Sequence, residues 1–305
     1  MYEELLDLMG VMLLMMLAGL VLQKTGMVSA EGKKSLVNVI LYLLLPCNII
    51  KAFCMDISMS QLRSMWVALA ASLGIQLFYL VLNSFLYRRF PEDEKPVYKY
   101  ATLCSNAGFL GNPISQGVFG DLGLLYASVF LIPQRVVMWT AGITCFSQGA
   151  NKKEAARKVL LHPCIIAVEI GLVLLLLQIR LPSVLDNTLS GFSRCCTGMT
   201  MLYVGTVLGD VDLRTLASVR QVYFALLRLV IIPAAVWAAL FFLGIDPLVT
   251  GVCVLLTAMP AGNTTAILAS KYHAHEDAAV RCVVFTTAMS VMTTPIWSFR
   301  LTAGL

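Results

Sequence analysis

The segments Asn106-Ala-Gly-Phe-Leu-Gly-Asn-Pro113 and Met259-Pro-Ala-Gly-Asn-Thr-Thr265 decide the fold, because each places glycine and proline inside a long apolar stretch. A helix interrupted at such a point leaves backbone N–H and C=O groups without partners, and lipid cannot supply them. The freed groups must therefore face protein or a wet cavity. One such break in each half of a chain is typical of a transporter whose binding site lies near the middle of the membrane.

The composition is that of a membrane protein. Of the 305 residues, 59% are hydrophobic and 13% are charged, whereas soluble domains are about 45–50% apolar and about 25% charged. The net charge of +5 resides mostly in clusters between apolar stretches, so it indicates orientation in a lipid bilayer and not a nucleic-acid partner. The sequence contains no nucleophile elbow, phosphate loop or metal-ligand spacing, so it does not indicate an enzyme, and we expect no cofactor.

A helix needs about 20 apolar residues to cross a bilayer, and ten stretches of the chain satisfy this requirement. They lie at 5–22, 36–55, 65–86, 98–119, 123–146, 159–178, 185–208, 219–243, 247–270 and 279–300. The two interruptions fall in the fourth and ninth stretches. These positions are equivalent if two halves of five helices, 1–146 and 159–305, are joined by a connector at 147–158.

Lysine and arginine are divided unevenly between the two sets of alternate loops, with 15 in one set and 4 in the other. The larger set is Lys24, Lys33, Lys34, Arg88, Arg89, Lys95, Lys99, Lys152, Lys153, Arg157, Lys158, Arg214, Arg220, Lys271 and Arg281. The positive-inside rule places this set in the cytoplasm and both termini outside. The sequence therefore predicts an all-α protein of the cell (inner) membrane, with ten transmembrane helices in two inverted five-helix repeats.

Three charged residues fall near the middle of predicted spans, where a charge is costly and suggests function. Arg135 can pair with Glu169, which either only neutralises both charges or makes Glu169 a coupling group. Arg228 either binds backbone carbonyls freed by a break or attracts an anionic substrate. The three together carry one surplus positive charge, which favours an anion as cargo.

Amide and hydroxyl side chains gather at the two breaks, where they either contact a substrate or only satisfy the broken backbone. The candidate substrate-binding residues are Asn48, Asn106, Asn112, Pro113, Arg135, Arg228, Asn263 and Thr264. The coupling candidates are Glu169 and His162, and the helix-break residues are Gly111, Pro113, Pro260 and Gly262. We also expect Pro46 to kink the second span and Gly205 to allow close helix packing in the seventh.

Several motifs resemble those of the auxin efflux carrier family. The segment Thr102-Leu-Cys-Ser-Asn106 through Gly111-Asn-Pro113 is similar to the fourth span of that family. The segment Pro260-Ala-Gly-Asn and the loop after it are similar to the ninth span, and Ser290 to Pro295 is similar to the last. The short connector resembles bacterial organic-anion carriers more than plant carriers with long loops.

The resemblance implies a fold in which spans four and nine are broken and cross each other, as in sodium/proton antiporters and bile-acid symporters. It implies a scaffold domain of spans one, two, six and seven, which forms a homodimer, and a transport domain of the other six. Transport would follow an elevator-like movement of the second domain. Asn106 would contact the substrate, and Pro113 would be the crossing proline. For bacterial members the family suggests a carboxylate as cargo.

Three functions remain open at this stage. The first is a secondary or facilitative transporter of a small organic anion. The second is a sodium- or proton-coupled symporter or antiporter of another substrate, although the fourth and ninth spans hold no paired acids at their breaks. The third is a membrane receptor that keeps the fold without transport. H+ and Na+ are the candidate coupling ions.

Overall fold

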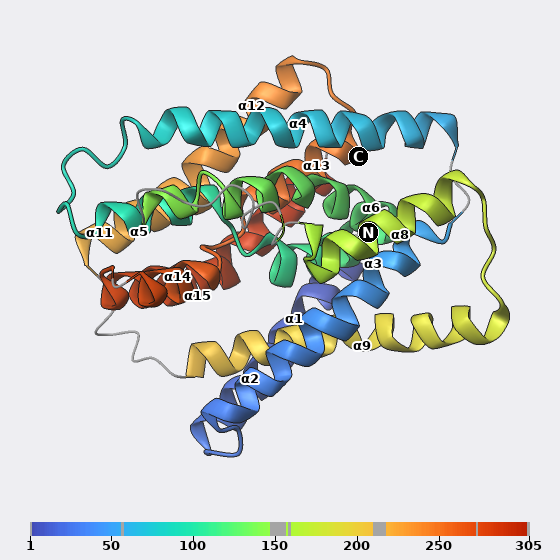
Figure 1. Ribbon diagram of the computed structural model, residues 1–305, viewed down its shortest axis with the longest axis horizontal. Coiled ribbons are helices and arrows are strands. Elements are labelled where there is room, and N and C mark those ends of the chain that lie inside the picture. The colour runs from blue at the N-terminus through green and yellow to red at the C-terminus, as the bar shows by residue number, and fades with distance from the viewer. Residues whose placement is uncertain are drawn as a thin grey trace.

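The computed structural model describes residues 2–55, 58–146, 157, 160–209, 218–272 and 274–303 (Figure 1). Most of the predicted connector at 147–158, including Lys152 and Lys153, lies outside the described residues. Within them the regular structure is helical, and the one β-type contact is an isolated bridge between Ser105 and Ala261. The predicted all-α class is therefore confirmed for the described part of the chain.

The first half of the chain forms helices at every predicted span. They are α1 (Tyr2–Lys24), α2 (Ala30–Val39), η1 (Ile40–Leu44), α3 (Leu45–Phe53), α4 (Met59–Asn83), α5 (Lys95–Leu103), η2 (Ala107–Gly111), α6 (Asn112–Trp139) and η3 (Ile143–Cys145). Within α6 the backbone of Gly120 has φ 69°, so two helices meet there at a kink. The kink separates the predicted fourth span from the fifth.

The second half repeats this pattern of long and interrupted helices. They are α8 (Pro163–Leu176), α9 (Ser183–Gly209), α11 (Val219–Leu226), η4 (Leu227–Ile231), α12 (Ile232–Phe242), α13 (Pro247–Thr257), α14 (Thr264–Lys271) and α15 (Glu276–Thr302). Five continuous helical stretches of the described chain are long and apolar enough to cross a membrane: Ala30–Phe53, Met59–Asn83, Ala107–Trp139, Val219–Phe242 and Glu276–Thr302. Shorter apolar helices occupy Gly10–Lys24, Pro163–Leu176 and Pro247–Thr257.

Three prolines impose the same local distortion on their helices. The π-helical turns η1, η2 and η4 end two residues before Pro46, Pro113 and Pro233, respectively. A proline has no N–H, and its ring clashes with the carbonyl one turn earlier. A wider turn absorbs that conflict without ending the helix. At Pro46 the expected disturbance is thus a widened turn within a helix that runs from Ala30 to Phe53.

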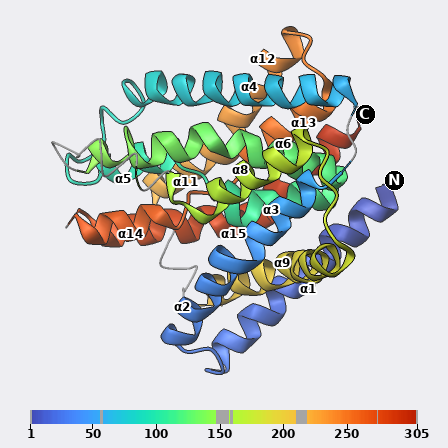
Figure 2. The same cartoon turned by 45° about the vertical axis from the view of Figure 1, so that its right-hand side comes forward.

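The helices pack as two groups. In the first helix group (α1, α2, α3, α8 and α9), α1 lies along α9, and α3 packs against α8 and α9. In the second helix group (α4, α5, α6 and α11 to α15), α4 and α13 pack on α6, and α12 packs on α13. Figures 1 and 2 show α1, α2 and α9 along one side of the molecule and α4 and α12 along the opposite side.

Glycines bring α1 and α9 into close contact. A Cβ atom on Gly205 would lie 1.8 Å from the carbonyl oxygen of Met16, and one on Gly19 would lie 2.0 Å from that of Leu202. No side chain fits at either position, so the two backbones touch where lipid-embedded helices gain most from close packing. The predicted packing role of Gly205 is confirmed.

Candidate functional site

The two helix breaks pair with each other at the centre of the second helix group. The backbone N–H of Asn106 donates to the carbonyl oxygen of Pro260 at 2.8 Å, and that of Gly262 donates to the carbonyl of Cys104 at 2.9 Å. Between these bonds Ser105 and Ala261 form the antiparallel bridge. Each break thus supplies the backbone partners that the other lost, as burial at membrane depth requires. We call this contact the crossing.

Two glycines permit the crossing. A Cβ atom on Gly262 would lie 3.0 Å from the carbonyl oxygen of Cys104 and 3.3 Å from that of Ser105. A Cβ atom on Gly111 would lie 2.5 Å from Cδ2 of Leu256, where η2 packs on α13. Both residues were predicted to be helix-break residues. At Gly262 the added Cβ would press on backbone, whereas at Gly111 it would press on the flexible end of the Leu256 side chain, so Gly262 is the more restrictive position.

Polar side chains hold the crossing from the surrounding helices. The Gln134 amide donates from Nε2 to the carbonyl of Ser105 at 2.8 Å, and its Oε1 accepts from the Ser105 hydroxyl at 3.1 Å. The hydroxyl of Thr286 accepts from the backbone N–H of Ala261 at 3.1 Å. These bonds fix the orientation of the two breaks.

Arg228 binds the crossing from the side away from the cavity described below. Its side chain is 0% exposed. Nε donates to the carbonyl of Met259 and Nη1 to the carbonyl of Thr102, each at 3.1 Å. The guanidinium also lies over the ring of Tyr79, 5.3 Å from its centroid. Of the two roles considered for Arg228, the structure shows the contact with backbone carbonyls, one from each broken helix.

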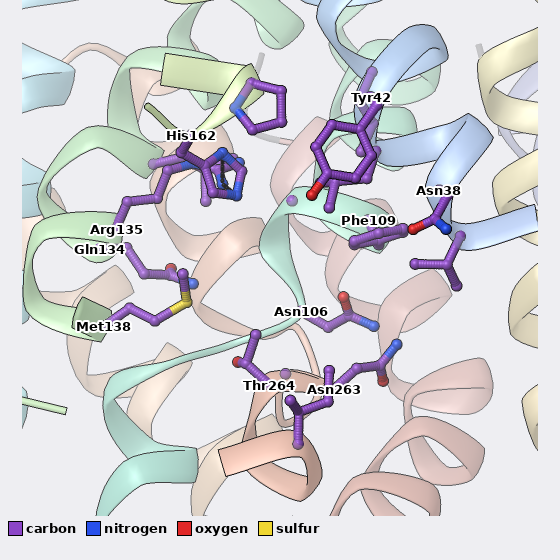
Figure 3. A pocket seen from close by; sticks show the side chains of 18 of the residues that line it. Asn38, Tyr42, Asn106, Phe109, Gln134, Arg135, Met138, His162, Asn263 and Thr264 are labelled. Atoms are coloured by element: carbon purple, nitrogen blue, oxygen red, sulfur yellow. Dashed lines mark hydrogen bonds between the residues drawn. The ribbon is translucent and has the colours of Figure 1, made fainter. Parts of the chain in front are cut away.

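A cavity of about 1010 Å³ opens in front of the crossing, between the two helix groups. Figure 3 shows the amides of Asn106 and Asn263 at its base, Arg135 and His162 on one side, and Tyr42 and Phe109 across from them. The first helix group contributes wall residues from α2 and α9, such as Asn38 and Tyr203, and the second contributes the crossing. The side chain of Asn106 makes no hydrogen bond within the described chain, whereas Asn263 donates to the Tyr203 hydroxyl at 3.2 Å.

The charged side chains that line this cavity are all basic. They are Lys33, Lys34, Arg135 and Arg157, and the described lining contains no aspartate or glutamate. The half-helix that continues from Asn106 and the helix α14 both begin at the cavity, so the positive ends of their dipoles add to the same potential. The cavity is therefore an environment for an anion.

Arg135 is held at the cavity wall by a neutral partner. Its Nη1 lies 3.0 Å from Nδ1 and 2.9 Å from Nε2 of His162, and His162 caps the start of α8 by accepting from the Cys164 N–H. Arginine only donates, so the imidazole facing it acts as an acceptor. The other end of the guanidinium reaches the broken helix, because a Cβ on Gly108 would lie 3.3 Å from Nη2 of Arg135. Among the described residues no carboxylate pairs with Arg135, so its positive charge remains beside the crossing.

The expected ion pair between Arg135 and Glu169 is not formed. Glu169 is exposed on α8 beside the exposed side chains of Ile166, Ile170 and Val173, and its carboxylate has no ionic partner in the described chain. The two residues lie on neighbouring spans, as predicted, but the helical phase of α8 turns Glu169 away from Arg135. The residue that meets Arg135 is His162, at the N-terminus of the same helix.

The structure divides the predicted substrate residues into two sets. Asn106, Asn263, Thr264 and Arg135 line the cavity, together with Gly262 and His162. Asn112, Pro113 and Arg228 are buried and do not line it, nor do the break residues Gly111 and Pro260. Asn48 is elsewhere: it donates to Gln116 of α6 at 3.2 Å and accepts from Ser193 of α9 at 2.6 Å, so it ties the two helix groups together.

Sequence reasoning missed three basic residues of the site, Lys33, Lys34 and Arg157, and counted all three as loop residues. Lys33 and Lys34 follow Ser29, which caps a helix that begins at Ala30, six residues before the expected start. Both lysines therefore lie on α2 and line the cavity. The serine at position 29, followed by Glu31 in the first turn, was the available signal for this earlier start.

Three proteins that are similar to this chain over much of its length are named as transporters. A protein of Methanocaldococcus jannaschii named an uncharacterized transporter is 21% identical over 97% of this chain and 98% of its own length. A second, from Methanothermobacter thermautotrophicus and also named an uncharacterized transporter, is 27% identical over 66% of each chain. A protein of Rhizobium meliloti named "Putative malonate transporter" is 21% identical over 78% of this chain and 74% of its own.

The family model described as "Membrane transport protein" matches residues 5–158 and 150–298, which together span nearly the whole chain. This chain is therefore a member of the membrane transport protein family, the auxin efflux carrier family that its motifs resemble.

Proposed function

We propose that this protein carries a small organic anion of the carboxylate type across the cell membrane. The observation that carries the proposal is the basic lining of the cavity, with four cationic side chains and no described carboxylate, at the foot of which two helix breaks meet. The name of the Rhizobium meliloti relative adds malonate as the first compound to try.

The binding residues that we propose are Asn106, Asn263 and Arg135. The side chain of Asn106 has hydrogen-bonding groups to spare beside the start of a half-helix, and Asn263 stands at the equivalent place in the other break. An amide donates to carboxylate oxygens, and the Arg135 guanidinium supplies the charge. Thr264 adds a hydroxyl at the same depth.

The mechanism that we propose is an elevator-like movement of the second helix group against the first, in a fold of two inverted five-helix repeats. Support comes from the packing, which is close within each group, and from the cavity, which lies between the groups. The bond between Asn48 and Gln116 joins the groups and would have to break when α6 moves. The first group would be the scaffold domain and the second the transport domain.

We also propose a homodimer through the scaffold, with both termini outside the cell. Support for the dimer is the exposed apolar face of α8, which includes Ile166, Ile170 and Val173. Support for the orientation is the 15 to 4 asymmetry of loop charges. A cysteine introduced at Lys34, on a background without native cysteines, should be protected from impermeant reagents in intact cells and labelled in inside-out vesicles.

Counterflow in proteoliposomes tests the function. Proteoliposomes that contain the purified protein are loaded with malonate or, in parallel, with another carboxylate. They should take up radiolabelled carboxylate faster than liposomes without protein do. A receptor would bind the compound without counterflow, and an antiporter of another substrate would give neither. The sodium- or proton-coupled alternative predicts that uptake depends on an imposed ion gradient.

A further inference from the structure

The side of the crossing opposite the cavity holds a permanent charge that the proposed binding site does not use. Arg228 is 0% exposed and does not line the cavity. Among the side chains that the structure describes, the only buried carboxylate is that of Glu94, and it pairs with Arg220 at 3.2 Å. Arg228 thus lies in the protein interior without an acidic partner, an arrangement that costs free energy unless other groups stabilise the charge.

Backbone carbonyls stabilise it through Nε and Nη1, while Nη2 is buried without a hydrogen-bond partner in the described chain. Thr102 and Met259, whose carbonyls accept from Arg228, each lie within two residues of a residue whose carbonyl closes the crossing, namely Cys104 and Pro260. The guanidinium therefore bridges the two broken helices directly behind the paired segments. Asn106 and Gly262 of those same segments face the cavity in front.

Carbonyl oxygens released by broken helices are also the groups that transporters use to coordinate a coupling cation. At this crossing one such carbonyl from each break already accepts a hydrogen bond from Arg228. A metal cation brought to the same oxygens would meet a fixed positive charge in a medium of low dielectric constant, where repulsion is strong.

We propose that Arg228 is a built-in cation of the crossing that takes the place of a bound metal ion, so that the protein binds its anion without Na+. The inference rests on the proposed function for the carboxylate that is bound. The statement that Arg228 takes the place of a metal ion does not depend on that function. The charge binds carbonyls of both broken helices without lining the cavity, is shielded from salt by burial, and remains in place when the anion leaves. Arg228 is therefore a positioning residue that acts through the crossing.

The first test measures malonate binding to the full-length protein, by calorimetry, in sodium and in choline buffers of equal ionic strength. The dissociation constant should be the same in both. Arg228→Met should weaken binding by about tenfold or more, because charged hydrogen bonds behind the site are lost, and Arg228→Lys should recover part of it. Arg300→Met is the matched control, since Arg300 also lies over an aromatic ring, 4.7 Å from the centroid of Trp237.

The second test needs no carboxylate. The melting temperature of the wild-type protein should be the same in sodium and choline buffers, and that of Arg228→Ala should rise when guanidinium ion is added at low concentration. Guanidinium should not raise the melting temperature of Arg300→Ala.

Either of two results would overturn the inference: a tighter dissociation constant or higher melting temperature of the wild type specifically in sodium, or undiminished malonate binding by Arg228→Met. If Arg228→Met does not fold, Arg228→Lys and the wild-type comparison still decide. If no carboxylate binds in either buffer, the proposed function is wrong, and the melting experiment alone decides whether Arg228 excludes a metal cation.

Discussion

The polar residues on the cavity side of the crossing differ in their hydrogen-bond partners from Arg228, which does not line the cavity. On the cavity side, Asn106 and Arg135 keep hydrogen-bonding capacity or charge that the protein itself does not satisfy. On the opposite side, Arg228 gives two of its donors to backbone carbonyls and lies over Tyr79. The difference teaches that residues equally unusual in an apolar sequence divide into those whose polar groups stay available at a cavity and those that bind the backbone of the protein itself.

The largest effect is expected from adding a side chain at Gly262, where the two breaks approach each other most closely. Gly262→Ala puts a Cβ 3.0 Å from the Cys104 carbonyl, so the backbone of Cys104 must shift by a few tenths of an ångström, and overpacking of this kind costs roughly 1–3 kcal/mol. Carboxylate counterflow should be lost and the melting temperature should fall. Gly74→Ala is the control, because nothing lies within 4 Å of its added Cβ. Full transport by Gly262→Ala would show that the crossing tolerates loosening.

Arg135 and Arg228 allow a direct comparison of the two sides. Arg135→Gln should weaken carboxylate binding by about ten- to a hundredfold, the value of a charged hydrogen bond, and leave the melting temperature near that of the wild type. Arg228→Gln should lower the melting temperature as well, since it releases two carbonyls. Calorimetry and thermal melting measure the two quantities, with Arg194→Gln, an exposed change on α9, as control. Equal stability losses in both variants would erase the distinction.

Asn106→Ala is expected to have a smaller effect, confined to binding. Loss of a neutral hydrogen bond that leaves a buried partner unpaired costs about 1–3 kcal/mol, so the dissociation constant should rise roughly tenfold. Stability should not change, because the Asn106 side chain bonds to nothing in the described protein. Asn187→Ala on the exposed face of α9 is the control. Unchanged affinity together with unchanged flux would remove Asn106 from the site.

The smallest effect is expected at Asn112, which is buried and does not line the cavity. Both polar atoms of its amide are buried without a hydrogen-bond partner in the described chain, so Asn112→Leu, which keeps the size, should leave melting temperature and flux unchanged or raise the former. Asn48→Leu is the contrasting change, because it breaks bonds to Gln116 and Ser193 and should lower the melting temperature. A loss of flux in Asn112→Leu would show that the amide meets the substrate in another conformation.

The helices and the breaks could be predicted because each depends on local chemistry. Runs of apolar residues specify helices, and Gly111, Pro113, Pro260 and Gly262 specify where they are interrupted. The span that includes α2 was predicted to begin at residue 36, with Lys33 and Lys34 in the preceding loop, whereas the Ser29 cap starts the helix at Ala30. Lys33 and Lys34 were thereby missed as lining residues.

The partners of the buried charges could not be predicted in the same way. Arg135 and Glu169 lie on successive spans, which suggests a pair, but contact also requires the right rotation of α8, and the sequence of an apolar helix does not reveal its rotation. For Arg228 both roles were chemically sound. The choice between them depended on which carbonyls lie within its reach, and those belong to residues 126 and 31 positions away in the chain.

By itself the sequence determined that this chain is an all-helical membrane protein of a transporter family, interrupted once in each half. Hydrophobicity, helix length and the loss of backbone hydrogen bonds at glycine and proline act over a few turns of chain and need no tertiary contact. Only the tertiary structure decided that the two interruptions pair with each other, that Arg135 faces the cavity and that Arg228 faces the backbone. Those outcomes depend on the positions and rotations of helices brought together by packing, which no short segment of sequence contains.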